Sequence, residues 1–558
     1  MKRLPLAALG GFVLVAALAL SSGGLGLGGV SSAPSAGPGA SAVVGGAATP
    51  TPTTGSSAAP APTEGGTSAE PTLLPAPTMA PVDLVDVPIV PVTQFRTTRT
   101  ATNGDQVAAI LLGTSERYDA LELVADEADA ILAELGLSET AAAAAEGRLA
   151  LADDAAALSA DLAEHRKRLA FLRADAVTPA VRALAWEGAS LFGTDRVRDR
   201  ADWALSARLP APADPADDFD PAATWTLFAG GDMLLDRGVY ETVRVKKKGV
   251  DFPFDGGTAE ITGRCKDCSP LGWDTPYTKR TGNKGAMRDL IQDADLAIAN
   301  FENPAPDRWR WHTRDTIFSA DPGIIEGIAN AGIDWVSLAN NHIGDQGRKG
   351  VLQTIKNIEK YGLRHAGAGA NVAAARTPSM FEFGDTTVAI LAYDAIYRPY
   401  NATASAAGSA RFTIKNVTAD VRTAREAGAE VVIVFPHWGR EYHYAPTARQ
   451  REQAHAIIEA GADMIIGNHA HYAAAMEVHE GKPIWYALGN FVFDQTWSEP
   501  TMEGITLELT FHGADLVQAR MRPHIILDKA QPNFLDPARD GRVVMKPIFD
   551  ASKGLLPW

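Results

Sequence analysis

Residues 431–437 read Val-Val-Ile-Val-Phe-Pro-His, and residues 464–471 read Met-Ile-Ile-Gly-Asn-His-Ala-His. Each stretch is a short apolar run that leads into histidine. Three earlier runs have the same form: Trp-Thr-Leu-Phe-Ala before Asp232, Leu-Ala-Ile-Ala before Asn300 and Glu302, and Trp-Val-Ser-Leu-Ala before Asn340, Asn341 and His342. Helical patterns separate the runs, so we expect an α/β fold in which all five are strands of one sheet. Because ligands of open α/β sheets bind at the carboxyl ends of the strands, the sequence predicts a site there.

The side chains at the ends of these runs are of metal-binding types. Imidazoles and carboxylates, with one amide oxygen, suit Mn, Fe or Zn better than Ca. The pattern predicts one or two divalent ions and six ligands: Asp232, Glu302, Asn341, His437, His469 and His471. We expect His469 and His471 to point to the same side of an extended segment, which is good geometry for chelation.

Other residues are candidates for roles beside the metal. His342 directly follows the candidate ligand Asn341, which is where a general acid for the leaving group, or an electrostatic clamp, belongs. Four residues are candidates for supporting the ligands or contacting a substrate: Arg237, Asp345, Glu441 and Asn490. Taken singly, each has an ordinary alternative; Glu302, for example, could be a solvated loop acid.

Five motifs occur in order through this region. They are Asn-Asn-His-Ile-Gly-Asp-Gln-Gly (340–347), Ala-Gly-Ala-Gly (366–369), His-Trp-Gly-Arg-Glu-Tyr (437–442), Gly-Asn-His-Ala-His (467–471) and Tyr-Ala-Leu-Gly-Asn-Phe-Val-Phe-Asp (486–494). Together they resemble the CapA family, which is associated with poly-γ-glutamate capsule synthesis and belongs to the calcineurin-like metallophosphatase superfamily. The resemblance extends from about Thr226 to Phe493. It implies a four-layer α/β/β/α sandwich, in which helices flank two sheets.

The resemblance also implies roles for individual residues. Its metal ligands correspond to Asp232, Glu302 as the bridging acid, Asn341, His437, His469 and His471, and its catalytic histidine corresponds to His342. Two departures from ordinary phosphatases stand out. Leu234 occupies the place of a histidine ligand, and Glu302 replaces a bridging aspartate. These departures imply that one metal site is weak or absent, and they count against phosphatase activity.

The chain of 558 residues is too long for a single core, and its net charge of −16 argues against nucleic acid as a partner. Residues 1–30 carry Lys2 and Arg3 before an apolar stretch from Leu4 to Leu20. This length lies between that of a cleaved signal peptide and that of a membrane anchor. We favour an anchor, and both interpretations place the folded part outside the cytoplasm.

Composition divides the rest of the chain. Residues 31–82 are rich in Pro, Ala, Thr and Gly and predict a disordered stalk. Residues 83–212 predict a small α/β or mostly helical accessory module, with helical patterns at 118–137 and 139–173. Residues 224–535 form the main domain, and residues 536–558 are expected to be a C-terminal tail. Residues 246–285 are expected to be a long loop, with a local disulfide between Cys265 and Cys268.

Three functions fit these observations. The first is an exported, metal-dependent hydrolase or transferase that acts on an anionic extracellular polymer or its precursor. The second is a non-catalytic scaffold that binds the polymer, or membrane-bound synthase subunits, at the membrane surface. The third, a metal-dependent phosphatase, rests on the superfamily alone.

Overall fold

The computed structural model describes residues 83–137, 146–212 and 214–558. Contacts between residues divide the chain into two units, 1–79 and 80–558. The predicted anchor or signal peptide (1–30) and stalk (31–82) lie outside the described residues and stay predictions. Among the helices that are described, none is long and apolar enough to cross a bilayer.

The N-terminal module, residues 83–212, is built on a mixed sheet with the strand order β4-β3-β5-β1-β6, in which β8 also pairs with β1. The strands are β1 (Leu84–Gln94), β3 (Ala120–Val124), β4 (Leu149–Ala152), β5 (Arg168–Arg173), β6 (Val181–Ala183) and β8 (Ser206–Pro210). Its helices are α1 (Gly104–Leu111), α2 (Ala128–Glu134) and α4 (Ala155–Glu164), and β2 (Ala101–Thr102) pairs with β7 (Ala185–Trp186). The small α/β module is therefore confirmed, whereas a mostly helical one is wrong.

The two helical patterns of this module were only partly correct. The pattern at 118–137 contains the strand β3 before α2, and the pattern at 139–173 contains β4, α4 and β5. Every residue of β3 is buried, so the strand lacks the alternation of polar and apolar residues that marks a half-exposed strand. A short run buried on both faces cannot be told from a helix by its periodicity.

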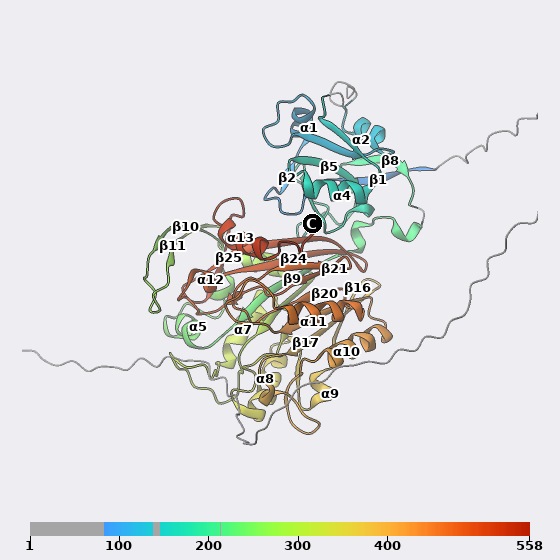
Figure 1. Ribbon diagram of the computed structural model, residues 1–558. Helices are drawn as coiled ribbons and strands as arrows, with labels where there is room; N and C mark the ends of the chain where they lie inside the picture. Colours follow the sequence, from blue (N-terminus) through green and yellow to red (C-terminus); the bar gives the residue numbers. More distant parts are fainter. Residues whose placement is uncertain (1–82, 138–145, 213) are drawn as a thin grey trace, which may run out of the picture. The chain divides into compact units, whose positions relative to one another are not determined.

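The main domain contains two large sheets (Figure 1). The strands of the larger sheet are β9 (Thr224–Met233), β10 (Thr258–Cys265), β11 (Thr275–Gly282), β12 (Leu296–Phe301), β13 (Trp335–Ser337), β14 (Arg364–Ala366), β23 (Asn490–Val492), β24 (Glu503–His512), β25 (Asp515–Leu527) and β26 (Gln531–Leu535). The strands of the smaller sheet are β16 (Ser379–Phe383), β17 (Thr386–Asp394), β19 (Val431–His437), β20 (Met464–Ile466), β21 (Met476–His479) and β22 (Lys482–Trp485). The short strands β15 (Ala368–Gly369) and β18 (Gly408–Ser409) form a separate pair.

Helices flank both sheets. They are α5 (Arg237–Tyr240), α6 (Ala286–Asp293), α7 (Ile325–Ala331), α8 (Gly347–Lys360), α9 (Val372–Ala375), α10 (Ile414–Glu426), α11 (Ala448–Glu459), α12 (Glu499–Met502) and α13 (Arg542–Ala551). The N-cap threonine Thr447 and Gln450 form a capping box at the start of α11, as the sequence predicts.

Alternating side chains divide the core into layers. Leu227 of β9 packs in the core between the sheets, together with Ile433 of β19, whereas Phe228 faces the opposite side. That outer face is covered by apolar residues of α6, α7 and α8. The outer face of the smaller sheet is covered by α10 and α11. The result is the four-layer α/β/β/α sandwich that the resemblance implies.

Four expectations need correction. The five apolar runs are strands, but β9, β12 and β13 belong to the larger sheet, whereas β19 and β20 belong to the smaller one. Sequence spacing shows where strands occur but does not show which strands pair. The loop expected at 246–285 contains the β10–β11 hairpin, and the expected Cys265–Cys268 disulfide joins the end of β10 to the turn that follows it. The segment 536–558 is no tail, because Val544 and Ile548 of α13 enter the core between the sheets. The boundary expected near 212–224 does not separate two units, since residues 80–558 form one.

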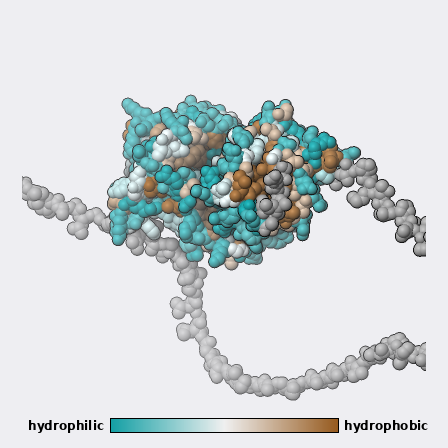
Figure 2. All heavy atoms as spheres, turned by 90° about the horizontal axis from the view of Figure 1, so that it is seen from above, coloured by the Kyte–Doolittle hydropathy of each residue, from teal (hydrophilic) through white to brown (hydrophobic). Residues whose placement is uncertain are grey.

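The N-terminal module packs on β24 and β25. Val517 of β25 belongs to the core of the module, and the ring of Phe95 lies 5.3 Å from that of Trp558. The backbone N–H of Gly193 donates to Oγ1 of Thr510 at 3.0 Å. The module therefore shares its core with the main domain. Figure 2 shows that hydrophilic residues cover most of the visible surface on one face, with apolar residues scattered among them.

We expect Arg196 to be one of the residues that most stabilise the junction between the N-terminal module and the main domain. Its buried guanidinium donates to Thr224 Oγ1 at 2.6 Å and pairs with Asp295 at 2.9 Å. We expect Arg196→Met to lower the free energy of unfolding by about 3 kcal/mol, because it leaves buried acceptors unpaired. The matched control is Arg198→Met, since the exposed Arg198 guanidinium pairs with the same carboxylate at 3.3 Å and should contribute less than about 1 kcal/mol. Thermal denaturation of both variants measures the difference; equal effects would contradict a buried stabilising role.

Candidate metal centre

Five candidate ligands come from both sheets and meet at their carboxyl ends. Asp232 lies near the end of β9, and Glu302 directly follows β12. His437 ends β19, and His469 and His471 follow β20. All five residues are buried. Because β9 runs parallel to β12 and β19 runs parallel to β20, the carboxyl ends of these strands bring together residues that are far apart in the sequence.

The segment that carries the last two histidines is not extended as expected. His469 has a φ of 90° and His471 a φ of 56°, which is the left-handed region. Residues other than glycine adopt this region at a cost of about 1–3 kcal/mol, and such residues cluster at functional sites. The turn still brings both imidazoles to the centre, with their rings 6.2 Å apart.

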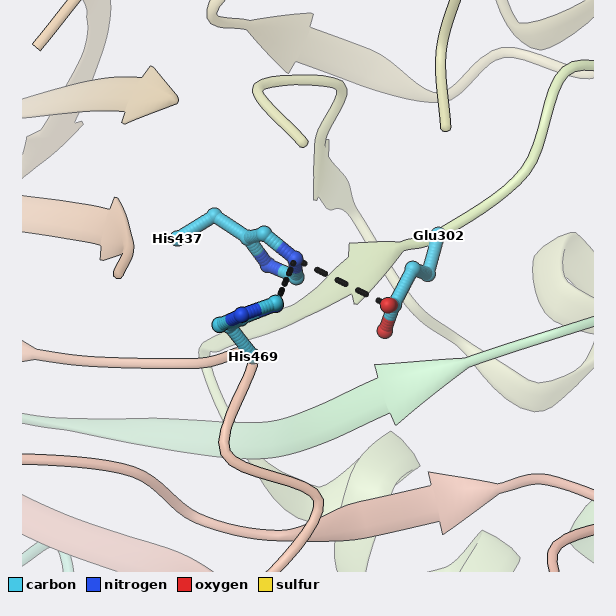
Figure 3. A group of neighbouring side chains, drawn as sticks. All are labelled: Glu302, His437 and His469. Atoms are coloured by element: carbon cyan, nitrogen blue, oxygen red, sulfur yellow. Dashed lines mark hydrogen bonds and ion pairs between the residues drawn. The ribbon is translucent and has the colours of Figure 1, made fainter. Parts of the chain in front are cut away.

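The candidate ligand atoms form two groups that share Glu302. In the first, Nε2 of His437 lies 3.6 Å from Oε1 of Glu302 and 3.2 Å from Nδ1 of His469 (Figure 3). In the second, His471 lies 3.7 Å from Oδ2 of Asp232 through Nδ1 and 3.8 Å from Oε1 of Glu302 through Nε2. Within each group the ligand atoms all lie within 4.8 Å of one another. Glu302 therefore occupies the position of a bridging acid.

Asn341 faces the same point through its amide oxygen. Oδ1 of Asn341 lies 2.8 Å from Nε2 of His437, the nitrogen that also faces Glu302. The structure thus brings all six predicted ligands together.

The carboxylate of Glu302 tests whether these residues fit a metal ion. Both of its oxygens are buried, and neither has a hydrogen-bond partner. An unpaired buried carboxylate costs several kcal/mol, and a bound cation would offset that cost. The residues present therefore fit a divalent ion, and the group of His, Asp and Glu side chains is compatible with metal binding.

Burial shifts the pKa of every ionisable group in this centre. It raises the pKa of Asp232 to about 7. Burial, with Asp232 alongside, raises the pKa of Glu302 well above its usual value. Burial also lowers the pKa of His437 and His469 well below the usual value, and that of His471 to about 4. The imidazoles are therefore neutral at pH 7, as metal ligands must be.

These shifts predict how the stability of the metal-free chain depends on pH. The site histidines stabilise the fold progressively as pH rises from about 4 to 6.5, because the unfolded chain then releases its extra protons. The acids have the opposite effect. Because their pKa is higher in the folded chain than in the unfolded chain, the stability that they contribute is lost as the pH rises through their pKa in the folded chain. Above pH 6.5 only the acids of this centre still titrate.

We therefore expect the chelated chain to lose roughly 2 kcal/mol of unfolding free energy between pH 6.5 and 8.5. The metal-loaded chain should not, because a cation favours the ionised carboxylates. Thermal melts with and without chelator measure the difference. Asp232→Asn is the control and should reduce the slope, because one of the two acids no longer titrates; a slope that this variant keeps in full would show that groups outside the centre cause it.

Two asparagines support the ligands. Nδ2 of Asn300 donates to Oδ1 of Asp232 at 2.7 Å. Oδ1 of Asn490 lies 2.9 Å from Nδ1 of His471, while its amide donates to Gln495 and to the backbone of Thr501. Asn490 was among the predicted supporting residues. Asn300 was not, although its place at the end of an apolar run was the signal that could have identified it.

His342 lies beside the ligands with a defined orientation. Its Nδ1 lies 3.0 Å from Oδ2 of Asp345, and its ring packs 4.3 Å from that of Phe318. Asp345 also accepts the backbone N–H of Phe318 at 2.8 Å. Because the Asp345 carboxylate accepts from Nδ1, Nε2 is the nitrogen left for a substrate. Asp345 thus positions His342. Phe318 is not among the residues predicted from the sequence.

Arg237 and Glu441 have weaker connections to the centre. The guanidinium of Arg237 pairs with Asp494 at 2.5 Å and lies 4.9 Å from the ring of Phe318, so its charge is already balanced. Glu441 makes no hydrogen bond to the ligands among the described residues. Its charge is nevertheless one of the influences that raise the pKa of Glu302.

Leu234 lies in an apolar cluster. Its side chain is fully buried and packs with Phe318, Phe493 and Ile526. This cluster, the Leu234 cluster, fills with apolar side chains the place where the resemblance implies a histidine ligand in ordinary phosphatases.

Comparisons with known proteins agree with this geometry. The family "Bacterial capsule synthesis protein PGA_cap" matches residues 226–495, the segment that contains every candidate ligand. The chain is 31% identical over 291 residues to the "Probable polyglutamine synthesis accessory protein" of Mycobacterium tuberculosis, covering 48% of this chain and 74% of that protein. The chain belongs to the PGA_cap family.

Two Bacillus relatives point the same way for this PGA_cap protein. It is 33% identical over 275 residues to the "Capsule biosynthesis protein CapA" of Bacillus anthracis, covering 48% of this chain and 66% of that protein. It is 30% identical over 230 residues to the "PGA biosynthesis protein CapA" of Bacillus subtilis, covering 39% of this chain and 60% of that protein. The chain therefore spans less than two thirds of the length of these two relatives.

Solved structures show only a distant likeness. The calcineurin-like phosphoesterase YfkN from Bacillus subtilis has 13% identity and a TM-score of 0.30, covering 60% of this chain and 98% of that chain. The NAD nucleotidase of Haemophilus influenzae has 11% identity and a TM-score of 0.32, covering 59% and 56%. At these TM-scores neither likeness carries weight for fold or function.

Proposed function

We propose that this PGA_cap-family chain is an exported, metal-dependent hydrolase or transferase that acts on an extracellular polymer of glutamate. The observation that carries the proposal is the pair of buried, unpartnered oxygens of Glu302, which face His437 and His471. The names of the relatives, which refer to capsule and polyglutamine synthesis, support the choice of polymer.

The metal would be held by the two groups that share Glu302. Glu302, His437 and His469 form one position, and Asp232, Glu302 and His471 form the other. When bound, divalent ions supply Lewis-acid chemistry, since they polarise a carbonyl or phosphoryl oxygen and acidify water. The Leu234 cluster makes one position weaker, so the occupancy we expect lies between one and two ions.

His342 would handle the proton of the leaving group. In amide hydrolysis, the oxygen of water bonds to the carbonyl carbon and loses a proton, the carbon–nitrogen bond breaks, and the departing nitrogen takes a proton. Nε2 of His342 can donate that proton, because Asp345 holds the ring through Nδ1. In a transferase the amine of an acceptor replaces water, and the same imidazole serves.

A non-catalytic scaffold is the second candidate. The observation that favours it is the Leu234 cluster, because a site that has lost a ligand position can bind metal without supporting turnover. The same cluster counts against a metal-dependent phosphatase. In either role we place the protein outside the cytoplasm at the membrane surface, with the polymer or membrane-bound synthase subunits as partners.

Metal content and turnover of the full chain test the proposal together. At least one transition ion per chain, with turnover of γ-glutamyl test substrates, is the expected result. Stoichiometric metal without turnover, and polymer binding that survives His342→Ala, would favour the scaffold. Turnover of phosphoesters alone would favour the phosphatase, and a chain that binds no metal would overturn both the hydrolase or transferase and the phosphatase.

A further inference from the structure

A cavity of about 690 Å³ lies between the N-terminal module and the C-terminal segment. One wall is the stretch 95–100 that follows β1, and the other is α13 with residues 553–554. None of the candidate metal ligands lines it. Its volume falls in the range of roughly 300–1,000 Å³ that is common for small-molecule sites.

The lining of this cavity is strongly basic, although the chain has a net charge of −16. Six cationic side chains contribute: Arg96, Arg99, Arg166, Arg182, Arg542 and Lys553. A seventh, Lys546, pairs with Asp550, the one acidic residue of the lining. Within the described part of the chain, no ion pair joins any of the six to a carboxylate. Like charges gathered in this way repel one another, so a bound anion would stabilise them.

In two of these arginines, a buried guanidinium nitrogen has no hydrogen-bond partner. Nε of Arg96 and Nε of Arg182 are buried and unpartnered. Burial lowers the pKa of Arg182 to about 9, with Arg520 contributing and Glu508 opposing. The guanidinium of Arg96 is held 4.9 Å from the ring of Phe549. Guanidinium groups pair with carboxylates through two parallel hydrogen bonds, which would satisfy such unpartnered nitrogens.

The cavity continues into a neighbour, which suits an extended ligand. A second cavity of about 590 Å³ shares Thr100, Arg182, Met521 and Pro537 with the first. Besides the shared Arg182, the arginines of the second cavity are Arg520, Arg522 and Arg539. The first two pair with Glu508, and the acidic residues Glu260, Asp536 and Asp540 also line this cavity, so the excess of positive charge stays with the first cavity. Phe95, Met545 and Phe549 give that cavity an apolar part, which suits the methylene groups between the charges of a polycarboxylate.

We propose that this cleft binds a strand of a polycarboxylate, separately from the metal centre. The identity of the polymer, a chain of glutamate, rests on the proposed function. Both walls of the first cavity lie outside residues 226–495, the segment that the PGA_cap family matches. The cleft therefore gives a role to the N-terminal module: it would hold the polymer while the metal centre acts on it.

The test is binding of synthetic poly-γ-glutamate to the full chain, with a cleft variant and a matched control. Arg99→Glu with Arg542→Glu reverses two exposed, unpaired charges of the cleft. Lys415→Glu with Arg422→Glu makes the same change in charge on exposed residues of α10. We expect the cleft variant to bind at least 10-fold more weakly, and the α10 variant to bind within 3-fold of the parent. Binding should weaken as salt rises, because the contacts are ionic.

Further arms separate this proposal from the proposed function. Glu302→Gln should keep polymer binding while it loses metal, and the cleft variant should keep its metal content and its activity on small γ-glutamyl substrates. If Glu302→Gln lost polymer binding and the cleft variant kept it, the proposed cleft site would be wrong, whereas the proposed function of the metal centre would still stand. If inorganic polyphosphate bound the cleft as tightly as the glutamate polymer does, the proposal that the cleft is a site for polycarboxylates would be wrong. If the cleft variant and the α10 variant weakened polymer binding equally, the polymer would be responding to the net charge of the protein and not to the cleft, and the proposal would be wrong.

Discussion

A Glu302→Gln variant is expected to lose its metal and yet, without metal, to unfold at a higher temperature than the parent chain. The carboxylate of Glu302 belongs to both ligand groups, so its replacement weakens both positions. We expect metal affinity to fall at least 100-fold, because even residues that only support a ligand contribute about 10–100-fold. The metal-free variant gains stability, because a neutral amide is cheaper to bury than a carboxylate beside Asp232.

Metal analysis after dialysis and thermal melts with chelator measure the two effects. Glu441→Gln is the matched control: it removes one negative charge near the centre without removing a ligand, and it should keep the metal. If Glu302→Gln retained the parent affinity, Glu302 would not be a ligand. If its chelated form melted below the parent, the unpartnered oxygens would not be a source of instability.

A His342→Gln variant should retain its metal and lose turnover by roughly 10²–10⁴-fold, the usual contribution of a general acid or base. Glutamine keeps a polar side chain of similar size but cannot donate a proton in this way. The loss should appear in kcat rather than in KM, because proton donation acts in the transition state. Steady-state kinetics on the γ-glutamyl substrate, with metal analysis of the same sample, measure it.

Asp345→Asn is the companion variant, since Asp345 acts through His342. An amide can still bond to Nδ1 but favours the other tautomer, so we expect a smaller loss of kcat and a changed pH profile. The metal content should not change in either variant. An unchanged kcat in His342→Gln would remove His342 from the mechanism and would leave the scaffold as the better account of the site.

The local structure of the main domain could largely be predicted from its sequence. Each of the five apolar runs is a buried strand, because a continuous run of Val, Ile and Leu suits a strand with both faces covered. The capping box of Thr447 and Gln450 marks the start of α11. The ligands could be named because acids, amides and imidazoles recur at the ends of such strands, and the resemblance covered the same residues.

The N-terminal module and the C-terminal segment were harder to predict. The strand β3 was hidden in a helical pattern, because all of its residues are buried. The sequence does not reveal that helix α13 belongs to the core, because the sheet residues that cover Val544 and Ile548 lie outside this segment. Burial of this kind depends on tertiary contacts, which periodicity within one segment does not contain.

The sequence was enough to predict the residue types of the centre and the strands that carry them, and to show that Leu234 stands where the resemblance implies a ligand. Those properties follow from local patterns and from motifs read in order. Three other features become visible only in the folded chain: two sheets share the ligands, both oxygens of Glu302 lack hydrogen-bond partners, and six cationic side chains gather beside α13. The reason is physical: strand pairing, desolvation and the meeting of charges depend on distances in space between residues that sequence order leaves far apart.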